Sequence, residues 1–343
     1  MKICIIKLGA KGDVVRTLPL LVGIKEKFPN SEINWITQPS SKEILETSPY
    51  INKILIIPVN NLGKQNFDIL YNFDIDEEAT KLATEIKAEK KYGFYSESNE
   101  GNSNYVACFN LSAEYYLNTL FDDETKKNNT KSYQEMMFEL AEIPYKKRFH
   151  PIYLTEQDKK HADDFLIKNK IKNNLNNQIN KKIIGIHVGS ADRWPSKKWH
   201  LDNLKEFIIK AKNKDYEILL FIGPDEKNYY NNLLKELDQE KVKIYSVSPS
   251  SDKEFFSLIN ICNKVISGDS FALHVALALK KPTIGLFFCT PPNEIEDYGL
   301  LKKIVSPFLY DFFPEKMDVY DENLTKSISA ERVLEELEKL NSY

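Results

Sequence analysis

The chain has 343 residues, which is longer than most single hydrophobic cores, and its length therefore predicts two domains. Hydrophobic residues make up 42% and charged residues 28%, which are ordinary values for a globular protein in water. A net charge of -3 gives no overall attraction for nucleic acid. No apolar run approaches the length that spans a bilayer, and the chain starts with a strand pattern rather than a signal peptide. The expected location is the cytoplasm.

Four cysteines are scattered along the chain without Cys-x-x-Cys spacing, and each lies in or beside an apolar run. This pattern predicts buried free thiols in a reducing compartment. The residues are Cys4, Cys108, Cys262 and Cys289.

Short apolar runs alternate with helical patterns in the first half of the chain. They predict strands at Lys2–Ile6, Glu32–Ile36, Lys53–Ile57 and Phe67–Phe73. A helix is expected between the first two strands, where Pro19 either produces a kink or begins a second segment capped by Thr17. Two further helices are expected, at Glu77–Lys91 and Ser132–Ile143.

The alternation restarts after an Asn/Lys-rich tract, Lys168–Lys182, which has little to bury and predicts an exposed loop. Expected strands are Lys182–His187, Tyr216–Ile222, Val242–Val247, Val265–Ser267 and Thr283–Phe287. Expected helices are His200–Lys212, Glu226–Leu237, Asp252–Ile261, Ser270–Leu279 and, at the end of the chain, about Ser329–Leu340. This order predicts an α/β protein with two parallel sheets, each covered by helices on both faces.

The turn after the first strand carries Gly9, Gly12 and Asp13. A strand that runs into a glycine-containing turn and then a helix is a common ligand site in α/β proteins, because glycine lets the backbone approach a ligand closely. The spacing matches neither the dinucleotide fingerprint nor the P-loop. Asp13 is either the N-cap of the following helix or a functional carboxylate.

A second marked turn follows the strand that ends at His187. It carries Gly189 and Ser190 and then the basic residues Lys197 and Lys198. Small and basic residues beyond the carboxyl end of a strand suit an anionic ligand such as phosphate. The alternative is a solvated loop whose tryptophans pack on the sheet.

Two more turns complete the set in the second half. Glu226 follows a Gly-Pro-Asp turn and either accepts from a ribose hydroxyl or favours its helix N-terminus electrostatically. Asp269 and Ser270 open a helix whose free amides can hold phosphate, and Asp269 is alternatively a cap. His274 lies one turn into this helix and is either a core histidine or a catalyst.

These features, in this order, resemble family 9 glycosyltransferases, the bacterial heptosyltransferases that build the inner core of lipopolysaccharide. The resemblance rests on the Lys-Leu-Gly-x-x-Gly-Asp-Val-Val-x-Thr-x-Pro start, the Lys-x-Trp loop, the Gly-Pro-Asp-Glu turn and the Gly-Asp-Ser-x-x-x-His turn. It implies a GT-B fold, in which two Rossmann-like domains face each other across a cleft. The implied domains are residues 1–155 for the acceptor, 156–325 for the nucleotide sugar, and a last helix, 326–343, that packs back on the N-terminal domain.

The resemblance also implies roles for individual residues. Asp13 corresponds to the general base, and Gly12 lies in the same turn. On the donor side, Lys197 or Lys198 is expected to contact phosphate and sugar, and Gly189 and Ser190 are expected to contact the diphosphate. Glu226 corresponds to the residue that binds the ribose, and Asp269 to the residue that binds the heptose hydroxyls. Ser270 and Phe271 correspond to residues whose amides bind phosphate, and His274 belongs to the same turn.

The expected reaction is inverting transfer of a heptose from ADP-heptose to a lipopolysaccharide core or related envelope acceptor. One carboxylate can act as general base, and lysine and a helix N-terminus can stabilise the leaving diphosphate. This chemistry needs no metal, and no cofactor is expected beyond the donor substrate. Asp74 and Asp76 have the spacing of a metal-binding pair but are interpreted as strand-end and cap residues. The alternatives are a GT-B transferase for another nucleotide sugar and a non-catalytic sugar-nucleotide-binding protein.

A glycolipid acceptor would place the protein at the inner face of the membrane. Basic residues in the first half could contact anionic lipid there, although such residues are usually solvated surface. They are Lys126, Lys127, Lys131, Lys146, Lys147 and Arg148.

Overall fold

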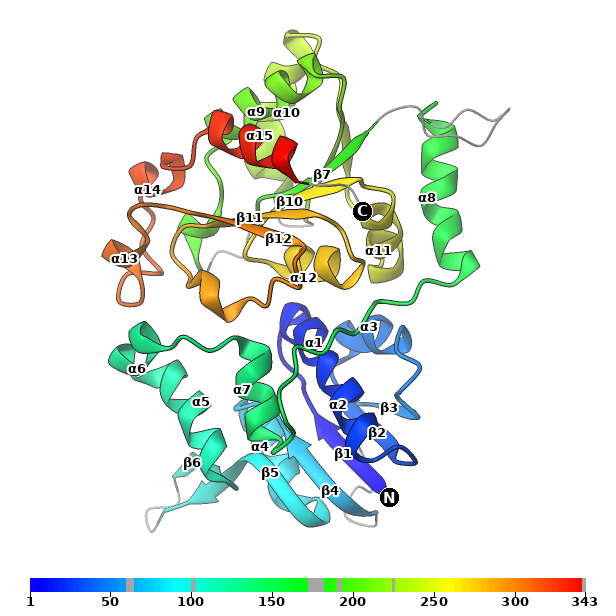
Figure 1. The fold of residues 1–343 in the computed structure, drawn as a ribbon, viewed down its shortest axis with the longest axis vertical. Helices are drawn as coiled ribbons and strands as arrows, with labels where there is room; N and C mark the ends of the chain where they lie inside the picture. Colours follow the sequence, from blue (N-terminus) through cyan, green and yellow to red (C-terminus); the bar gives the residue numbers. More distant parts are fainter. Residues whose placement is uncertain (60–64, 100–102, 172–181, 190–192, 224–225, 341–343) are drawn as a thin grey trace. The chain divides into compact units, whose positions relative to one another are not determined.

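The computed structural model describes residues 1–59, 65–99, 103–171, 182–189, 193–223 and 226–340. The chain divides into two compact units (Figure 1). The first unit comprises Met1–Tyr153 and Asn293–Glu296, and the second comprises Leu154–Pro292 and Asp297–Tyr343. The division after Tyr153 lies two residues before the expected domain boundary at 155.

The first unit is a six-stranded sheet with flanking helices, in the strand order β3-β2-β1-β4-β5-β6. All neighbouring strands are parallel except β5 and β6, which are antiparallel. The strands are β1 (Lys2–Ile6), β2 (Glu32–Thr37), β3 (Lys53–Ile56), β4 (Asn66–Asn72), β5 (Lys87–Ser98) and β6 (Asn104–Cys108). The α-helices are α1 (Lys11–Thr17), α2 (Pro19–Lys27), α3 (Lys42–Glu46), α4 (Glu77–Glu85), α5 (Leu111–Phe121), α6 (Asp123–Asn128) and α7 (Tyr133–Leu140).

The second unit repeats this order as β12-β11-β10-β7-β8-β9, and all of its strands are parallel. The strands are β7 (Ile183–His187), β8 (Glu217–Phe221), β9 (Tyr245–Val247), β10 (Lys264–Gly268), β11 (Thr283–Phe287) and β12 (Leu301–Val305). The α-helices are α8 (Glu156–Lys168), α9 (Leu201–Asn213), α10 (Lys227–Gln239), α11 (Asp252–Asn260), α12 (Phe271–Ala278), α13 (Leu309–Phe312), α14 (Glu322–Lys326) and α15 (Ala330–Lys339). Both orders are those of a Rossmann fold, so the expected α/β class is confirmed for each unit.

Pro19 begins a second helix rather than kinking one long helix. It is the first residue of α2, where a missing amide proton costs no helical hydrogen bond. The expected cap at Thr17 is wrong, because Leu18 is the cap residue and the Thr17 hydroxyl donates to the Asp13 carbonyl instead. The two helices together still bury the apolar face that the sequence predicts.

The expected helix Glu77–Lys91 is too long. Helix α4 ends at Glu85, and Lys87–Lys91 begins strand β5, which pairs with β4. Strand β5 pairs with the short antiparallel strand β6 and is only partly buried. Its sequence is therefore polar and lacks the apolar run by which a buried strand is recognised. Strands β6 and β12 were likewise not expected from the sequence.

The C-terminal helix α15 packs within the second unit. Its apolar residues Val333, Leu334 and Leu337 lie in the same hydrophobic cluster as residues of α9 and α10. The prediction that this helix packs back on the N-terminal domain is therefore wrong. The sequence showed an apolar face on the helix but could not show which sheet it would cover.

A short segment from the second half of the chain belongs to the first unit instead. Asn293–Glu296 follows β11, and the Asn293 side chain donates to the Asn129 carbonyl over 2.6 Å. Glu296 is buried and accepts a hydrogen bond from Tyr145. These polar contacts show how four residues far along the chain complete the first unit.

The four cysteines are free thiols, as the sequence predicts. Cys4, Cys262 and Cys289 are buried, and Cys108 is half-buried. Burial raises the pKa of Cys289 to about 11, so this thiol stays protonated near neutral pH.

Candidate functional site

Both sheets bring polar turns together where their strand order reverses. In the first unit β1 lies beside β4, with Ile6 opposite Asn72, and in the second β7 lies beside β10, with His187 opposite Ser267. Ligands of Rossmann-like folds bind outside the carboxyl ends of strands at such reversal points. Three of the four turns singled out in the sequence follow β1, β7 and β10, so they are placed at these two positions, and the fourth, which carries Glu226, follows the neighbouring strand β8.

An ion pair joins two of the turns in the second unit. The Lys197 ammonium lies 2.9 Å from the Asp269 carboxylate, and the two side chains are 16% and 18% exposed. Lys197 ends a short 3-10 helix, Pro195–Lys197, which is anchored where the Ser196 hydroxyl donates to the Val319 carbonyl. The pair is reachable from solvent, so each charge can exchange its partner for a ligand.

The structure separates the two lysines that the sequence left as alternatives. Lys197 is directed to Asp269, whereas the Lys198 ammonium lies 5.2 Å from the centre of the Tyr229 ring. A cation over an aromatic face is held by the ring quadrupole. Lys197 is therefore the lysine that reaches the turn after β10.

Asp269 does not cap α12. The cap residue is Ser270, and the Asp269 carboxylate pairs with Lys197. Phe271 begins the helix and stacks on Phe255, with ring centroids 5.5 Å apart. His274 lies one turn further and is buried. The amides of Ser270 and Phe271 stand at the start of a helix, as the sequence predicts.

Glu226 lies against two glycines. Its carboxylate accepts a 2.8 Å hydrogen bond from the Gly223 amide. A side-chain carbon on Gly189 would lie 1.7 Å from the Glu226 carboxylate, so only glycine leaves room for Glu226 in this position. Gly189 thus makes room for the Glu226 carboxylate. The sequence motif did not reveal this role, since it suggested only a contact with diphosphate. Ser190, the neighbouring predicted residue, lies outside the described residues.

His187 is a member of this cluster that the sequence analysis did not select. It ends β7, its Nδ1 lies 3.2 Å from the Ser270 hydroxyl, and its Nε2 lies 3.9 Å from the Glu226 carboxylate. Burial lowers the pKa of His187 more than the nearby Glu226 raises it. A histidine as the last residue of an apolar strand was the signal that could have identified it.

Asp13 is in the first turn of α1, not at its cap. The cap residue is Ala10, and it makes no side-chain capping hydrogen bond. The Asp13 carboxylate instead lies 2.8 Å from Nη2 and 2.9 Å from Nε of Arg16. The alternative that Asp13 is an N-cap is therefore wrong. Gly12 precedes it within the same turn.

Arg16 is held between Asp13 and an aromatic ring. Its guanidinium carbon lies 3.8 Å from the centre of the Tyr133 ring. Burial would lower the pKa of Arg16, but Asp13 and Tyr133 together raise it above its ordinary value. Arg16 is therefore charged at every physiological pH, and it fixes the Asp13 carboxylate in orientation.

A buried ion pair shapes the glycine turn before α1. The Lys7 ammonium lies 3.1 Å from the Asp74 carboxylate, and the two side chains are 3% and 8% exposed. The other Asp74 oxygen accepts hydrogen bonds of 2.6 Å from the amides of Leu8 and Gly9. Burial alone would lower the pKa of Lys7, but Tyr133, Asp74 and Asp13 raise it. Asp74 is thus a structural anchor for the turn, a role that its interpretation as a strand-end residue missed.

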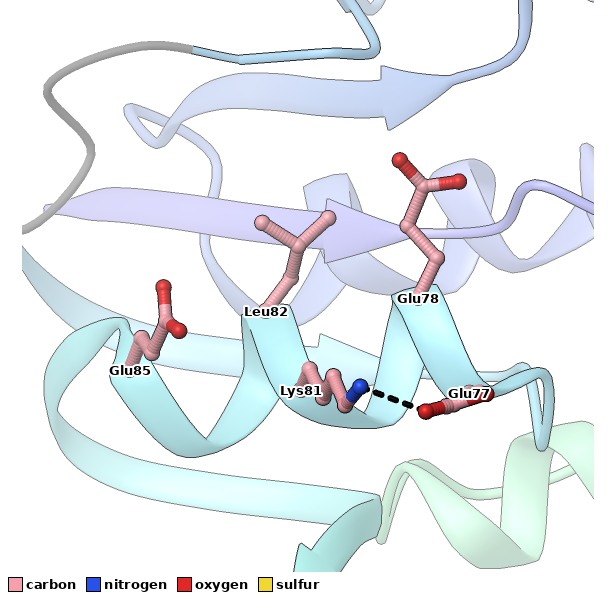
Figure 2. A pocket seen from close by; sticks show the side chains of 5 residues that line it. All are labelled: Glu77, Glu78, Lys81, Leu82 and Glu85. Carbon is pink, nitrogen blue, oxygen red and sulfur yellow. Dashed lines mark hydrogen bonds and ion pairs between the residues drawn. The ribbon is translucent and has the colours of Figure 1, made fainter.

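A shallow hollow of about 390 Å³ lies along α4. Figure 2 shows that all of its labelled side chains come from this one helix, with Lys81 paired to Glu77 one turn earlier. An ion pair between residues four apart is typical of a solvated helix face. The hollow contains none of the residues predicted for the site.

Basic residues suggested for lipid contact mostly pair with carboxylates of the same unit. Lys126 lies 3.3 Å from Asp123 and Lys131 lies 2.6 Å from Glu139. Arg148 pairs with Glu26. In the part of the chain that the structure describes, no helix is both long and apolar enough to cross a bilayer.

The sequence model of the family described as glycosyltransferase family 9 (heptosyltransferase) matches residues 59–313, which is more than half of the chain. The chain belongs to glycosyltransferase family 9. The family expected from the sequence is thus confirmed, and with it the assignment as a glycosyltransferase.

Curated relatives match over most of their length. A lipopolysaccharide heptosyltransferase 1 from Campylobacter coli is 26% identical over 341 residues, covering 89% of this chain and 91% of the relative. A lipopolysaccharide core heptosyltransferase from Haemophilus influenzae is 23% identical, covering 99% and 97%.

Solved structures confirm the GT-B class of fold. The family 9 glycosyl transferase from Veillonella parvula has a TM-score of 0.75 at 18% identity, covering 98% of this chain and 96% of that one. The E. coli ADP-heptose lipopolysaccharide heptosyltransferase II has a TM-score of 0.71 at 18% identity, covering 99% and 98%.

The buried pair of Lys7 and Asp74 supports a prediction about stability. Replacing Asp74 by Asn leaves the Lys7 charge buried without a carboxylate, which typically costs about 3–5 kcal/mol. Urea unfolding measures the loss. The control is Glu77→Gln, which breaks the exposed pair in Figure 2 and is expected to leave the free energy of unfolding almost unchanged. Equal effects of the two variants would contradict the structural role assigned to Asp74.

Proposed function

We propose that this glycosyltransferase transfers a heptose from ADP-heptose to a lipopolysaccharide core or related envelope acceptor, with inversion and without a metal. The observation that carries the proposal is that, at its reversal point, each unit places a charged side chain that solvent can reach. These are Asp13 in the first unit and Lys197 in the second. The names of the relatives, which are lipopolysaccharide heptosyltransferases, support the choice of donor and acceptor.

On the donor side, Lys197 exchanges Asp269 for the diphosphate. A diphosphate carries more negative charge than one carboxylate, so it is the stronger partner for a half-buried ammonium. Asp269 then accepts hydrogen bonds from hydroxyls of the sugar. The amides of Ser270 and Phe271, at the start of α12, add their dipoles to the stabilisation of the leaving group.

On the acceptor side, Asp13 takes the proton of the attacking hydroxyl. The acceptor oxygen forms a bond to the anomeric carbon while the bond from that carbon to the ADP oxygen breaks, and the proton passes to the Asp13 carboxylate. One displacement of this kind inverts the anomeric centre. Arg16 keeps the carboxylate oriented but is itself too basic to remove a proton.

The acceptor determines where the enzyme works. A glycolipid acceptor places it beside the inner face of the membrane, and we propose a cytoplasmic enzyme that meets its acceptor there. Lys126, Lys131 and Arg148 are already neutralised by neighbouring carboxylates, which argues against these residues as the lipid contact.

A comparison of the two neighbouring lysines tests the donor side. Lys197→Ala removes a charge-assisted hydrogen bond to the leaving diphosphate, which lowers kcat/KM roughly 10- to 100-fold. Lys198→Ala removes the ammonium that lies over the Tyr229 ring and is expected to change kcat/KM less than about threefold. Steady-state transfer assays with varied ADP-heptose measure both. A larger loss in Lys198→Ala would overturn the assignment.

Asp13→Asn separates catalysis from structure on the acceptor side. The amide oxygen of Asn still accepts from Arg16 but does not take the acceptor proton, so turnover is expected to fall ~10²–10⁴-fold. ADP affinity, measured by calorimetry, is expected to stay within about threefold, because the nucleotide residues belong to the second unit. Near-normal turnover would leave Asp13 as only a structural partner of Arg16.

Excess EDTA tests the proposed metal independence. Because Lys197 and the α12 amides supply the positive potential for the diphosphate, transfer is expected to continue at an unchanged rate. The assay follows ADP release in the presence of acceptor, with the chelator added before the donor. Activity that disappears and returns with Mg²⁺ or Mn²⁺ contradicts the proposal.

A further inference from the structure

Tyr133 is a completely buried tyrosine that the proposed reaction does not use. It is the first residue of α7, directly after the cap residue Ser132. A buried phenol normally finds a hydrogen-bonding partner for its hydroxyl. The partner is Thr17 at the end of α1, and the two hydroxyl oxygens lie 3.0 Å apart. Tyr133 therefore links α7 to the short helix that carries Asp13.

Thr17 passes this contact on to the main chain of Asp13. The Thr17 hydroxyl donates to the Asp13 carbonyl over 2.6 Å, one helical turn earlier. Thr17 is itself buried, and a hydrogen bond shielded from water is stronger than one at the surface. A first route of contact thus runs from the Tyr133 hydroxyl through Thr17 to the backbone that carries the Asp13 carboxylate.

A second route runs from the Tyr133 ring through Arg16. The guanidinium carbon lies 3.8 Å from the ring centre, where the ring quadrupole attracts a cation. Burial raises the pKa of Tyr133, so the phenol stays neutral and holds Arg16 through its ring face. Both Nη2 and Nε of Arg16 contact the same Asp13 oxygen, Oδ1. Two nitrogens of one planar group on a single oxygen fix the direction of that oxygen.

The Tyr133 ring is a rigid support for both routes. Tyr116 packs edge-on against it, with ring centroids 5.9 Å apart and an angle of 77° between the ring planes. The Ser132 hydroxyl caps α7 by accepting from the Glu135 amide, which fixes the start of the helix. The Asp13 side chain is 32% exposed, whereas Tyr133 is buried. A substrate can therefore reach Asp13 but not Tyr133, whose influence on a reaction must pass through its neighbours.

We propose that Tyr133 is a positioning residue for the base Asp13: its ring fixes Arg16 and its hydroxyl fixes Thr17, so that the Asp13 carboxylate and backbone are held in one orientation. The inference rests on the proposed role of Asp13 as general base. A base that is held in the direction of the acceptor hydroxyl removes its proton efficiently, and small misplacements lower the rate steeply. Loss of either route is therefore expected to lower kcat and to leave the binding of both substrates unchanged.

Removal of single hydroxyl groups tests the first route. Tyr133→Phe keeps the ring on Arg16 but removes the hydroxyl, and Thr17→Val removes the hydroxyl between Tyr133 and Asp13. Each variant is expected to lower kcat about 3- to 10-fold, which is the size of one hydrogen bond. The double variant is expected to lose no more than the worse single variant, because both changes remove the same route. The losses of two independent contacts would instead multiply.

Thr47→Val is the matched control. The Thr47 hydroxyl is buried in the same unit and also donates to a helix carbonyl, that of Ile44, over 2.7 Å. This variant is expected to lower the melting temperature as much as Thr17→Val does but to leave kcat unchanged. An equal loss of kcat in the two variants would mean that any lost hydroxyl slows the enzyme, and it overturns the positioning role.

Tyr133→Leu tests the second route, because leucine fills part of the space but offers no ring face to Arg16. It is expected to lower kcat about 2- to 30-fold below that of Tyr133→Phe. If the leucine variant does not fold, Tyr133→Phe and Thr17→Val still decide the proposal. Calorimetric titration with ADP is expected to give the wild-type affinity in every folded variant, since the nucleotide residues belong to the second unit.

Transfer from ADP-heptose to heptose-deficient lipopolysaccharide, with each substrate varied in turn, supplies kcat and KM. A lowered kcat with unchanged KM supports the positioning role. It is overturned, with the proposed function left intact, by an unchanged kcat in Tyr133→Phe, by multiplied losses in the double variant, or by a raised acceptor KM at unchanged kcat. A wild-type protein that releases no ADP from this pair of substrates overturns the proposed function and the positioning role together.

Discussion

A parallel sheet presents the carboxyl ends of all its strands at one edge, and the reversal of strand order concentrates the polar turns at one place on that edge. In the first unit the chain leaves β1 toward β2 on one side and leaves β4 toward β5 on the other. The second unit repeats this arrangement with β7 and β10. Charged side chains have no place among the apolar strands, so they gather where these turns begin. Residues distant in sequence, such as Lys197 and Asp269, meet for this reason.

Three ion pairs at these positions differ in how far solvent reaches them, and this difference assigns their roles. Lys7 and Asp74 are almost completely buried, and Asp74 also accepts two backbone amides, so the pair holds a turn and is unable to change partners. Arg16 with Asp13, and Lys197 with Asp269, keep part of their surface in contact with solvent. A charge that remains reachable can act on a ligand, whereas a sealed one stabilises the backbone around it.

The sequence predicted the α/β class, most of the strands and the turns that carry Asp13, Lys197 and Asp269, because apolar runs and glycine turns are local signals. It did not predict contacts that depend on two distant segments. The buried partner of Lys7 follows another strand, and Gly189 is required by a carboxylate more than thirty residues later. Strand β5 was missed because it is only partly buried, so its composition is polar although it pairs with β4 and β6. The place of α15 could not be inferred, because an apolar helix face does not identify the sheet that it covers.

Because Asn293–Glu296 belongs to the first unit, that unit cannot complete its folding until most of the second unit has been synthesised. The first unit ends its main segment at Tyr153, yet the partner of Tyr145 is Glu296, which emerges 143 residues later (296 − 153). At roughly 5–20 residues per second, the ribosome needs roughly 7–30 s to supply it. During that interval the nascent first unit exposes the surface that this segment covers. A truncated chain that stops after Tyr153 retains that exposed surface permanently, so the gene cannot be cut at the visible domain boundary without leaving the first unit incomplete.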